Sequence, residues 1–166
     1  MKKVVIINGS GGVGKDTFCD LCNKHIPCKV ISTVDKVKEA YKVLGWDGNK
    51  SEICRKGLSD IKDISTQTLD HPYKYVEENI KQFYQDDTYE ILFIHSREPD
   101  EINRIAKNHC CSTLLIKNNR INTISTNHAD AEAENFNYNY IINNDGTLEY
   151  LESKVIKFIE KLEYYE

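Results

Sequence analysis

The sequence predicts a three-layer α/β fold, in which a five-stranded parallel sheet carries helices on both faces. Strand-like and helix-like segments alternate along most of the chain, which is typical of a parallel sheet built from strand–helix–strand units. The first segment, residues 3–8, is largely apolar without alternation, as expected of a strand buried on both faces. The composition, with 40% hydrophobic and 29% charged residues, is that of a globular protein with a core.

The predicted elements follow one another in a regular order. Strands are expected at Lys3–Asn8, Cys28–Ser32, Glu90–His95, Cys111–Lys117 and Tyr138–Asn143. Helices are expected at Lys15–His25, Asp35–Leu44, Ser51–Ile64, Pro72–Gln85, Pro99–Asn108 and Thr147–Glu163. Pro27 marks the end of the first helix, Gly45 lies past the end of the second, and Pro99 occupies the first turn of the fifth.

Two excursions interrupt this alternation within what we expect to be one domain over residues 1–166. A helical insert, residues 35–88, separates the second strand from the third. A polar loop rich in Asn, residues 118–135, follows the fourth strand. Because extra segments at the carboxyl ends of parallel strands usually hold substrate, we expect the insert to bind a substrate and the loop to act as a lid.

Charge and hydropathy exclude several classes of protein. The formal net charge is -4, which disfavours a nucleic-acid binder because such proteins carry a basic field. The opening apolar run is too short for a signal peptide, and no other segment approaches the roughly 20 apolar residues of a membrane span. We therefore expect a cytoplasmic protein, monomeric or homodimeric, without nucleic-acid or membrane partners.

Cysteine and histidine recur every third residue at Cys19, Cys22, His25 and Cys28. One interpretation is a zinc site. The other is core packing, because Cys19 and Cys22 fall on the packing side of the first expected helix and no second ligand cluster follows. The packing interpretation is favoured, and the thiols of a cytosolic protein should be reduced.

The strongest motif is the segment Gly9-Ser10-Gly11-Gly12-Val13-Gly14-Lys15, which matches the first part of the phosphate-binding P-loop pattern. It leaves a buried strand and opens a helix, which is the context that this loop requires. Glycines permit turns whose N–H groups converge on an anion, and the helix N-terminus adds its positive end. The motif therefore predicts ATP binding by Gly9, Gly11, Gly12, Val13, Gly14 and Lys15.

The residues after this lysine depart from the usual P-loop, which places Ser or Thr there as a magnesium ligand. Here Asp16 takes that position and Thr17 follows. The Gly-Lys-Asp-Thr arrangement resembles the deoxynucleoside monophosphate kinases and is similar to animal-type phosphomevalonate kinase. The resemblance implies a three-layer P-loop NTPase fold, with Asp16 and Thr17 binding Mg²⁺ and phosphate. An equally open interpretation of Asp16 is a first-turn acid that favours the helix dipole.

Further matches come in chain order. Asp35 and Lys38 lie where the deoxynucleotide kinases begin their acceptor-binding helix, and Arg55 follows near a phosphate-binding arginine of that family. Arg97 comes after the third strand, where these kinases usually place another such arginine. Asn144-Asp145-Gly146-Thr147-Leu148 resembles the turn at which dephospho-coenzyme A kinases hold adenine. This resemblance implies that the residues of the helical insert and Arg97 bind the acceptor, and that Asp145, Gly146 and Thr147 bind ATP.

The expected activity is therefore that of an ATP-dependent kinase acting on a small phosphorylated acceptor, and the resemblance favours a (deoxy)nucleoside monophosphate. Lys15, Asp16, Arg97 and Arg120 are the expected catalytic residues, with Arg120 supplied by the lid-like loop. With this activity, residues 35–88 are expected to form the acceptor-binding insert. The partners are thus a nucleoside triphosphate with Mg²⁺ and the acceptor.

Alternatives stay open at this point. A nucleotide-binding regulator or an NTPase without a small-molecule acceptor is a second hypothesis. A third is a nucleotide-binding remnant that has lost catalysis, because His95 and Ser96 stand where many P-loop kinases carry an Asp. The guanine signature Asn-Lys-x-Asp of GTPases is absent from the sequence. Individually, Asp35 also suits a helix N-cap, Arg55 an exposed helix surface, and His95 a packed strand position.

Overall fold

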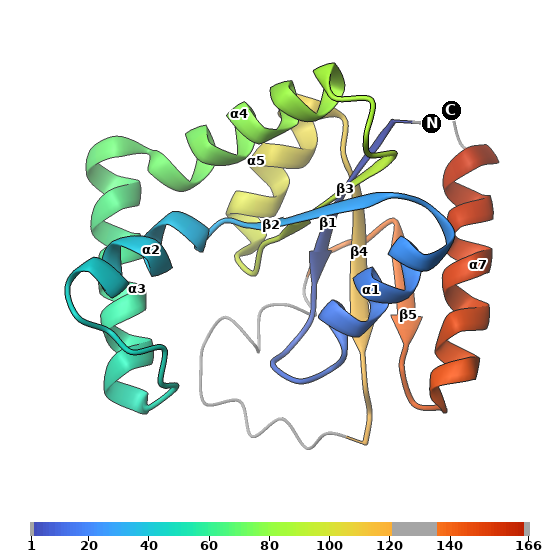
Figure 1. The fold of residues 1–166 in the computed structure, drawn as a ribbon, viewed down its shortest axis with the longest axis horizontal. Coiled ribbons are helices and arrows are strands. Elements are labelled where there is room, and N and C mark those ends of the chain that lie inside the picture. The colour runs from blue at the N-terminus through green and yellow to red at the C-terminus, as the bar shows by residue number, and fades with distance from the viewer. Residues whose placement is uncertain (1, 121–135, 165–166) are drawn as a thin grey trace.

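The computed structural model describes residues 2–120 and 136–164, and its five strands form one parallel sheet with helices on both faces (Figure 1). The strands are β1 (Lys3–Asn8), β2 (Cys28–Ser32), β3 (Ile91–His95), β4 (Ser112–Lys117) and β5 (Tyr140–Asn143). Their order across the sheet is β2-β3-β1-β4-β5. This architecture confirms the predicted fold class.

Strand β1 occupies the centre of the sheet. It pairs in parallel with β3, from Lys3 opposite Ile91, and with β4, from Val5 opposite Ser112. Val5, Ile6 and Ile7 have no exposed surface. The absence of an apolar/polar alternation in this strand follows from that position, because helices cover both of its faces.

Two helical layers enclose the sheet. The helices are α1 (Lys15–His25), α2 (Asp35–Val43), α3 (Glu52–Leu69), α4 (His71–Gln85), α5 (Pro99–His109) and α7 (Leu148–Tyr164). Helices α1 and α7 pack on one face, where the ring of Phe18 meets the rings of Phe93 and Phe158 edge to face. Helices α4 and α5 pack on the other face, with Ile80 and Ile102 among their buried side chains. No helix in the described ranges is both long and apolar enough to cross a membrane.

The helical insert lies to one side of the sheet, with α2 and α3 beyond the end of β2 (Figure 1). Helix α3 is longer than predicted and continues past Ile64 to Leu69. In this last stretch the hydroxyls of Ser65 and Thr66 donate to the carbonyl oxygen of Lys62, so these polar residues bond within the helix and do not end it. Asp70, in the left-handed conformation, then joins α3 directly to α4.

Most other element ends lie within two residues of the expected positions. Strand β5 begins at Tyr140 rather than Tyr138, whose ring packs against Phe136 instead. In the lid-like loop predicted over residues 118–135, the structure describes Asn118, Asn119 and Arg120, and residues 121–135 lie outside the described part.

Candidate nucleotide and acceptor site

The glycine loop begins at a buried asparagine that ties three segments together. The side-chain amide of Asn8 donates to the carbonyl oxygen of Arg97 at 3.1 Å and to the hydroxyl of Tyr138 at 2.8 Å. Its side-chain oxygen accepts the backbone N–H of Gly9 at 2.7 Å. Asn8 therefore fixes the first glycine relative to the turn after β3 and the segment before β5. The sequence analysis did not identify it, since two of its partners lie far away in the chain.

The backbone of the loop requires glycine at three positions. Gly9, Gly12 and Gly14 have φ angles of 146°, 81° and 97°, which side chains rarely adopt. A β-carbon on Gly9 would also lie 2.4 Å from the carbonyl oxygen of Ile116, whereas one on Gly11 would meet nothing within 4 Å. Residues with positive φ in such a turn direct successive N–H groups to one concave side. The loop thus has the conformation and the open surface of an anion cradle.

Lys15 lies at the mouth of this loop. Its ammonium group donates to the carbonyl oxygens of Gly9 and Ser10, the latter at 2.9 Å. Helix α1 begins at this lysine, directly after Gly14. The positive end of the helix and the lysine charge therefore coincide at the glycine loop, which fits a triphosphate.

The segment after β5 clamps the loop from the other side. Asn144 donates its side-chain amide to the carbonyl oxygen of Val13 at 2.9 Å, and Val13 itself is buried in the core. The same amide nitrogen lies 2.4 Å from where a β-carbon on Gly14 would be. Asn144 begins the turn that the sequence assigns to adenine, but the sequence did not predict that it would hold the glycine loop.

The predicted adenine segment follows at once. Both carboxylate oxygens of Asp145 accept hydrogen bonds from Asn119, one from its backbone N–H at 2.7 Å and one from its side-chain amide at 3.0 Å. Gly146 is exposed, and the hydroxyl of Thr147 accepts the backbone N–H of Tyr150 in the first turn of α7. Asp145 therefore joins the segments that follow β4 and β5, beside the glycine loop.

Arg120 follows Asn119 at the end of the described part of the lid-like loop. It is exposed, and its backbone N–H donates to the side-chain oxygen of Asn118 at 3.0 Å. The bond between Asp145 and Asn119 anchors the base of this loop close to the predicted adenine segment. Arg120 thus lies on the same side of the site as the predicted adenine segment.

His95 ends β3 beneath the start of α1. Its Nε2 atom lies 3.8 Å from a carboxylate oxygen of Asp16 and 3.9 Å from the sulfur of Cys19. Burial lowers the pKa of His95, and the nearby charge of Lys15 acts in the same direction, while that of Asp16 opposes it. The side chain of Asp16 is 93% exposed, so His95 is the inner and Asp16 the outer member of this pair.

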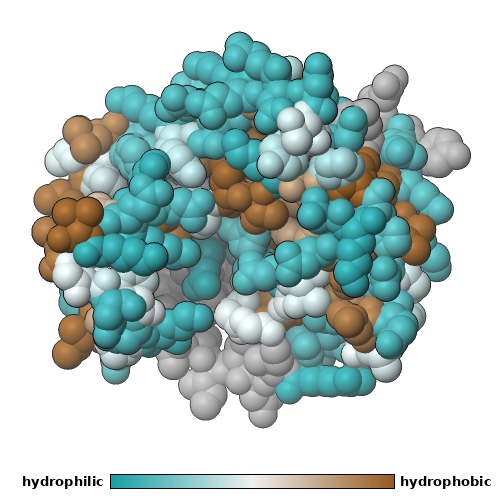
Figure 2. All heavy atoms as spheres, viewed as in Figure 1, coloured by the Kyte–Doolittle hydropathy of each residue, from teal (hydrophilic) through white to brown (hydrophobic). Residues whose placement is uncertain are grey.

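The predicted acceptor residues of α2 follow the end of β2, where Ser32 lies opposite His95 in the sheet. The charges of Asp35 and Lys38 both act on the pKa of His95. Asp35 also accepts the backbone N–H of Ser32 at 2.7 Å, so it stabilises the turn between β2 and α2. The structure therefore brings the start of α1 and the end of β2 together around His95. Figure 2 shows a hollow in this face of the molecule.

Asp16 and Thr17 are both exposed in the first turn of α1. Among residues 2–120 and 136–164, no three His, Cys, Asp or Glu side chains are grouped so that they could hold a metal ion. Asp16 and Thr17 offer oxygen ligands, which suit Mg²⁺, and phosphate oxygens and waters would complete its coordination. The two residues therefore fit a magnesium ion that arrives with a nucleotide.

The sulfur atoms of the candidate zinc cluster belong to the core instead. Cys19, Cys22 and Cys28 are buried, and burial raises the pKa of each thiol. His25 is exposed and lies 3.0 Å from a carboxylate oxygen of Glu152 on α7. The structure thus agrees with core packing of these cysteines, which was the favoured interpretation, and not with a zinc site.

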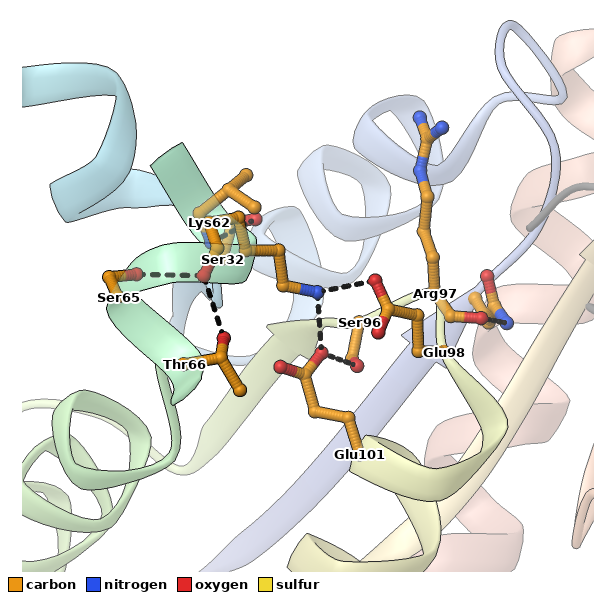
Figure 3. A network of polar contacts seen from close by, with 10 residues as sticks. Ser32, Lys62, Ser65, Thr66, Ser96, Arg97, Glu98 and Glu101 are labelled. Atoms are coloured by element: carbon orange, nitrogen blue, oxygen red, sulfur yellow. Dashed lines mark hydrogen bonds and ion pairs between the residues drawn. The ribbon is translucent and has the colours of Figure 1, made fainter. Parts of the chain in front are cut away.

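The two predicted acceptor arginines come from different elements. Arg55 is exposed on α3, and its side chain has no hydrogen bond or ion pair with another described residue. Arg97 is exposed in the turn after β3, and its side chain points away from the polar network of Figure 3. That network joins Lys62 to Glu98 and Glu101, and nothing in the sequence pattern had indicated it.

Similar folds occur in solved structures. Shikimate kinase from Aquifex aeolicus matches with a TM-score of 0.56 and 10% identity, over 98% of this chain and 99% of that one. A sugar kinase from Janibacter matches with a TM-score of 0.55 and 8% identity, over 96% and 95%. Shikimate kinase from Bacteroides thetaiotaomicron matches with a TM-score of 0.52 and 15% identity, over 97% and 98%.

The chain has the P-loop kinase fold. This finding confirms the predicted fold, and at these identities it shows the fold alone. No model of a protein family matches the sequence, and no curated protein does. The narrower resemblance to deoxynucleoside monophosphate kinases stays a prediction, since the three P-loop kinase structures above are of other kinds.

Proposed function

We propose that the protein is an ATP-dependent phosphotransferase that acts on a small phosphorylated acceptor, with a (deoxy)nucleoside monophosphate as the first candidate. One observation carries the proposal. The glycine loop has positive φ angles at Gly9, Gly12 and Gly14 and holds the ammonium group of Lys15, and the end of β2 that leads into the helical insert lies beside His95, next to the start of α1. A regulator needs only the loop, whereas a kinase also needs an acceptor surface beside it.

The nucleotide side of the site uses the loop and the segment after β5. The backbone of Gly11–Gly14 and the charge of Lys15 would bind the outer phosphates, and Asp145–Thr147 would lie along the adenine. Asp16 and Thr17 would hold Mg²⁺ together with phosphate oxygens. When bound, the ion neutralises charge on the phosphates of ATP.

Three of the predicted acceptor ligands are cations, Lys38, Arg55 and Arg97. Planar guanidinium groups bind phosphate through paired hydrogen bonds, which favours a phosphorylated acceptor over a neutral one. Asp35 would orient the acceptor from the start of α2. These roles are our proposal for residues whose positions are described above.

In the transfer, an oxygen of the acceptor forms a bond to the γ-phosphorus of ATP. The bond from that phosphorus to the bridging oxygen breaks, and its electron pair leaves with ADP. An acceptor phosphate supplies an oxygen that is already ionised, so the step depends on positioning and charge neutralisation. Lys15, Asp16, Arg97 and Arg120 would serve these ends, with Arg120 approaching from the lid-like loop.

The test is ADP formation with and without candidate acceptors. The panel contains nucleoside and deoxynucleoside monophosphates, dephospho-coenzyme A and phosphomevalonate, and it includes shikimate and sugars because kinases of similar fold are named for them. Lys15→Ala should abolish ATP binding, whereas Arg97→Ala should spare ATP binding and abolish transfer. If no member of the panel raises ADP formation above the rate with ATP alone, the proposal is wrong.

A second candidate is a nucleotide-binding regulator or an NTPase without a small-molecule acceptor. The observation that favours it is the histidine at the end of β3, where many P-loop kinases carry an Asp. Hydrolysis of ATP that no acceptor accelerates, or a strong preference for guanine nucleotides, would support this alternative. The cytoplasmic location and the monomeric or homodimeric state are predictions that belong to either function.

A further inference from the structure

Helix α3 is attached to the rest of the protein in an unusual way. It has eighteen residues, and the one that is buried is a lysine, Lys62. Large apolar side chains on the same helix face solvent, with Ile53 exposed by 82% and Ile64 by 61%. Figure 2 shows apolar side chains on the surface over this side of the molecule. Helices of globular proteins usually attach through a buried apolar stripe, and α3 has little of one.

Lys62 instead enters a polar network that we call the Lys62 network, formed with Ser96, Glu98 and Glu101 (Figure 3). The ammonium group lies 2.8 Å from Oε1 of Glu98 and 3.5 Å from Oε2 of Glu101. The hydroxyl of Ser96 donates to that same oxygen of Glu101 at 2.5 Å. The network therefore connects α3 with the turn after β3 and with the first turn of α5.

Two of the three charged side chains in this network are largely buried. The side chain of Lys62 is 11% exposed and that of Glu101 is 13% exposed, while that of Glu98 is 53% exposed. Burial acts to lower the pKa of Lys62, but the two carboxylates outweigh it and hold the pKa above its usual value. A buried ion pair of this kind fixes geometry more than it adds stability, because desolvation offsets most of the attraction.

The network surrounds the turn that carries Arg97. Ser96 and Glu98, on either side of it, both belong to the network. The carbonyl oxygen of Arg97 is held separately by Asn8, at the start of the glycine loop. The turn is thus fixed between the glycine loop and α3, while the arginine side chain points away from the network (Figure 3).

We propose that Lys62 is a positioning residue, which holds the acceptor helix α3 and the Arg97 turn in one arrangement for binding the acceptor. The proposal rests on the proposed function, because Arg55 on α3 and Arg97 in the turn are the predicted acceptor ligands. Without the ammonium group, the buried carboxylate of Glu101 keeps only the Ser96 hydroxyl. The turn and α3 then lose the ion pairs that join them, so Arg55 and Arg97 are held less firmly relative to each other.

The experiment compares Lys62→Met with Lys56→Met. Lys56 lies on the same helix and pairs with Asp60 at 2.7 Å, but both side chains are more than half exposed. In Lys62→Met the KM for the acceptor should rise about tenfold or more, because Arg55 and Arg97 are no longer held in one arrangement for binding it. The affinity for ATP should stay within about twofold of the wild type, and Lys56→Met should change neither. Lys62→Arg keeps the charge, so its KM for the acceptor should lie closer to that of the wild type than to that of Lys62→Met.

A folded Lys62→Met protein with an unchanged acceptor KM overturns the proposal, and so does an equal rise in the control. If Lys62→Met does not fold, Glu98→Gln takes its place, because that carboxylate is half exposed. Hydrogen exchange without acceptor separates this inference from the proposed function. Faster exchange in α3 of Lys62→Met, but not of Lys56→Met, supports the positioning role even if the wild type transfers no phosphate. Equal exchange in both variants refutes it.

Discussion

Replacing Gly14 with alanine tests the geometry of the glycine loop at the position where it contacts Asn144. Gly14 has φ 97° and ψ 27°, and a β-carbon there would lie 2.4 Å from the side-chain nitrogen of Asn144. A side chain in the left-handed region costs about 1–2 kcal/mol. Displacing Asn144 from the carbonyl of Val13 loses a hydrogen bond of about 1 kcal/mol. Gly14→Ala should therefore lower the free energy of unfolding by about 2–3 kcal/mol.

Urea unfolding at equilibrium measures this loss, and thermal unfolding should show a fall in Tm of about 4–12 °C for a domain of this size. Gly11→Ala is the matched control, because its β-carbon meets nothing within 4 Å and its φ is not positive. That variant should keep its free energy of unfolding within about 0.5 kcal/mol of the wild type.

The double variant separates strain from the lost hydrogen bond. Gly14→Ala and Asn144→Ala each remove the bond between Asn144 and Val13, so the double variant loses it once. Its destabilisation should therefore fall short of the sum of the two single effects by about 1 kcal/mol. Strict additivity, or a Gly14→Ala protein as stable as Gly11→Ala, would show that the loop does not have the conformation described.

Three further predictions concern other parts of the structure. Asn8→Ala should lower the free energy of unfolding by about 2–3 kcal/mol in urea titrations, because it leaves the Tyr138 hydroxyl and two backbone groups without their partner. Asp70 pairs with Arg104 through two hydrogen bonds of 2.6 Å, which lower the pKa of the carboxylate. The stabilisation from this partly exposed pair is present above about pH 4 and is lost as the pH falls through the lower pKa of the folded state. Acid titration of unfolding should show this loss in the wild type and not in Asp70→Asn. Iodoacetamide at neutral pH should modify the exposed Cys110 well before Cys19, which mass spectrometry of timed samples can check.

The fold was predictable because its evidence is local. Each strand and helix shows its own hydrophobic pattern, and glycine and proline mark the ends at Gly45 and Pro99. The extension of α3 to Leu69 was not predictable. Ser and Thr hydroxyl groups compete with the helix backbone for hydrogen bonds, but they can also donate to carbonyl oxygens of their own helix, as they do here. Sequence alone does not decide between the two.

The candidate site was predictable where it is contiguous. The glycine loop and Lys15 are neighbours in the chain, so one motif gives both the backbone conformation and the charge. Asn8, Asn144 and Lys62 were missed because their roles depend on Tyr138, Val13 and Glu98, which are distant in sequence. The role of each residue is visible only when the fold brings its partner next to it.

The central place of β1 has a consequence for synthesis of the chain. The glycine loop is synthesised well before the two strands that pair with β1, which begin at Ile91 and Ser112. Asn144, which holds the loop from the far side, comes later still. Because contacts so distant in sequence form slowly, the nascent protein acquires its ability to hold a nucleotide only after the segment through Asn144 has been synthesised.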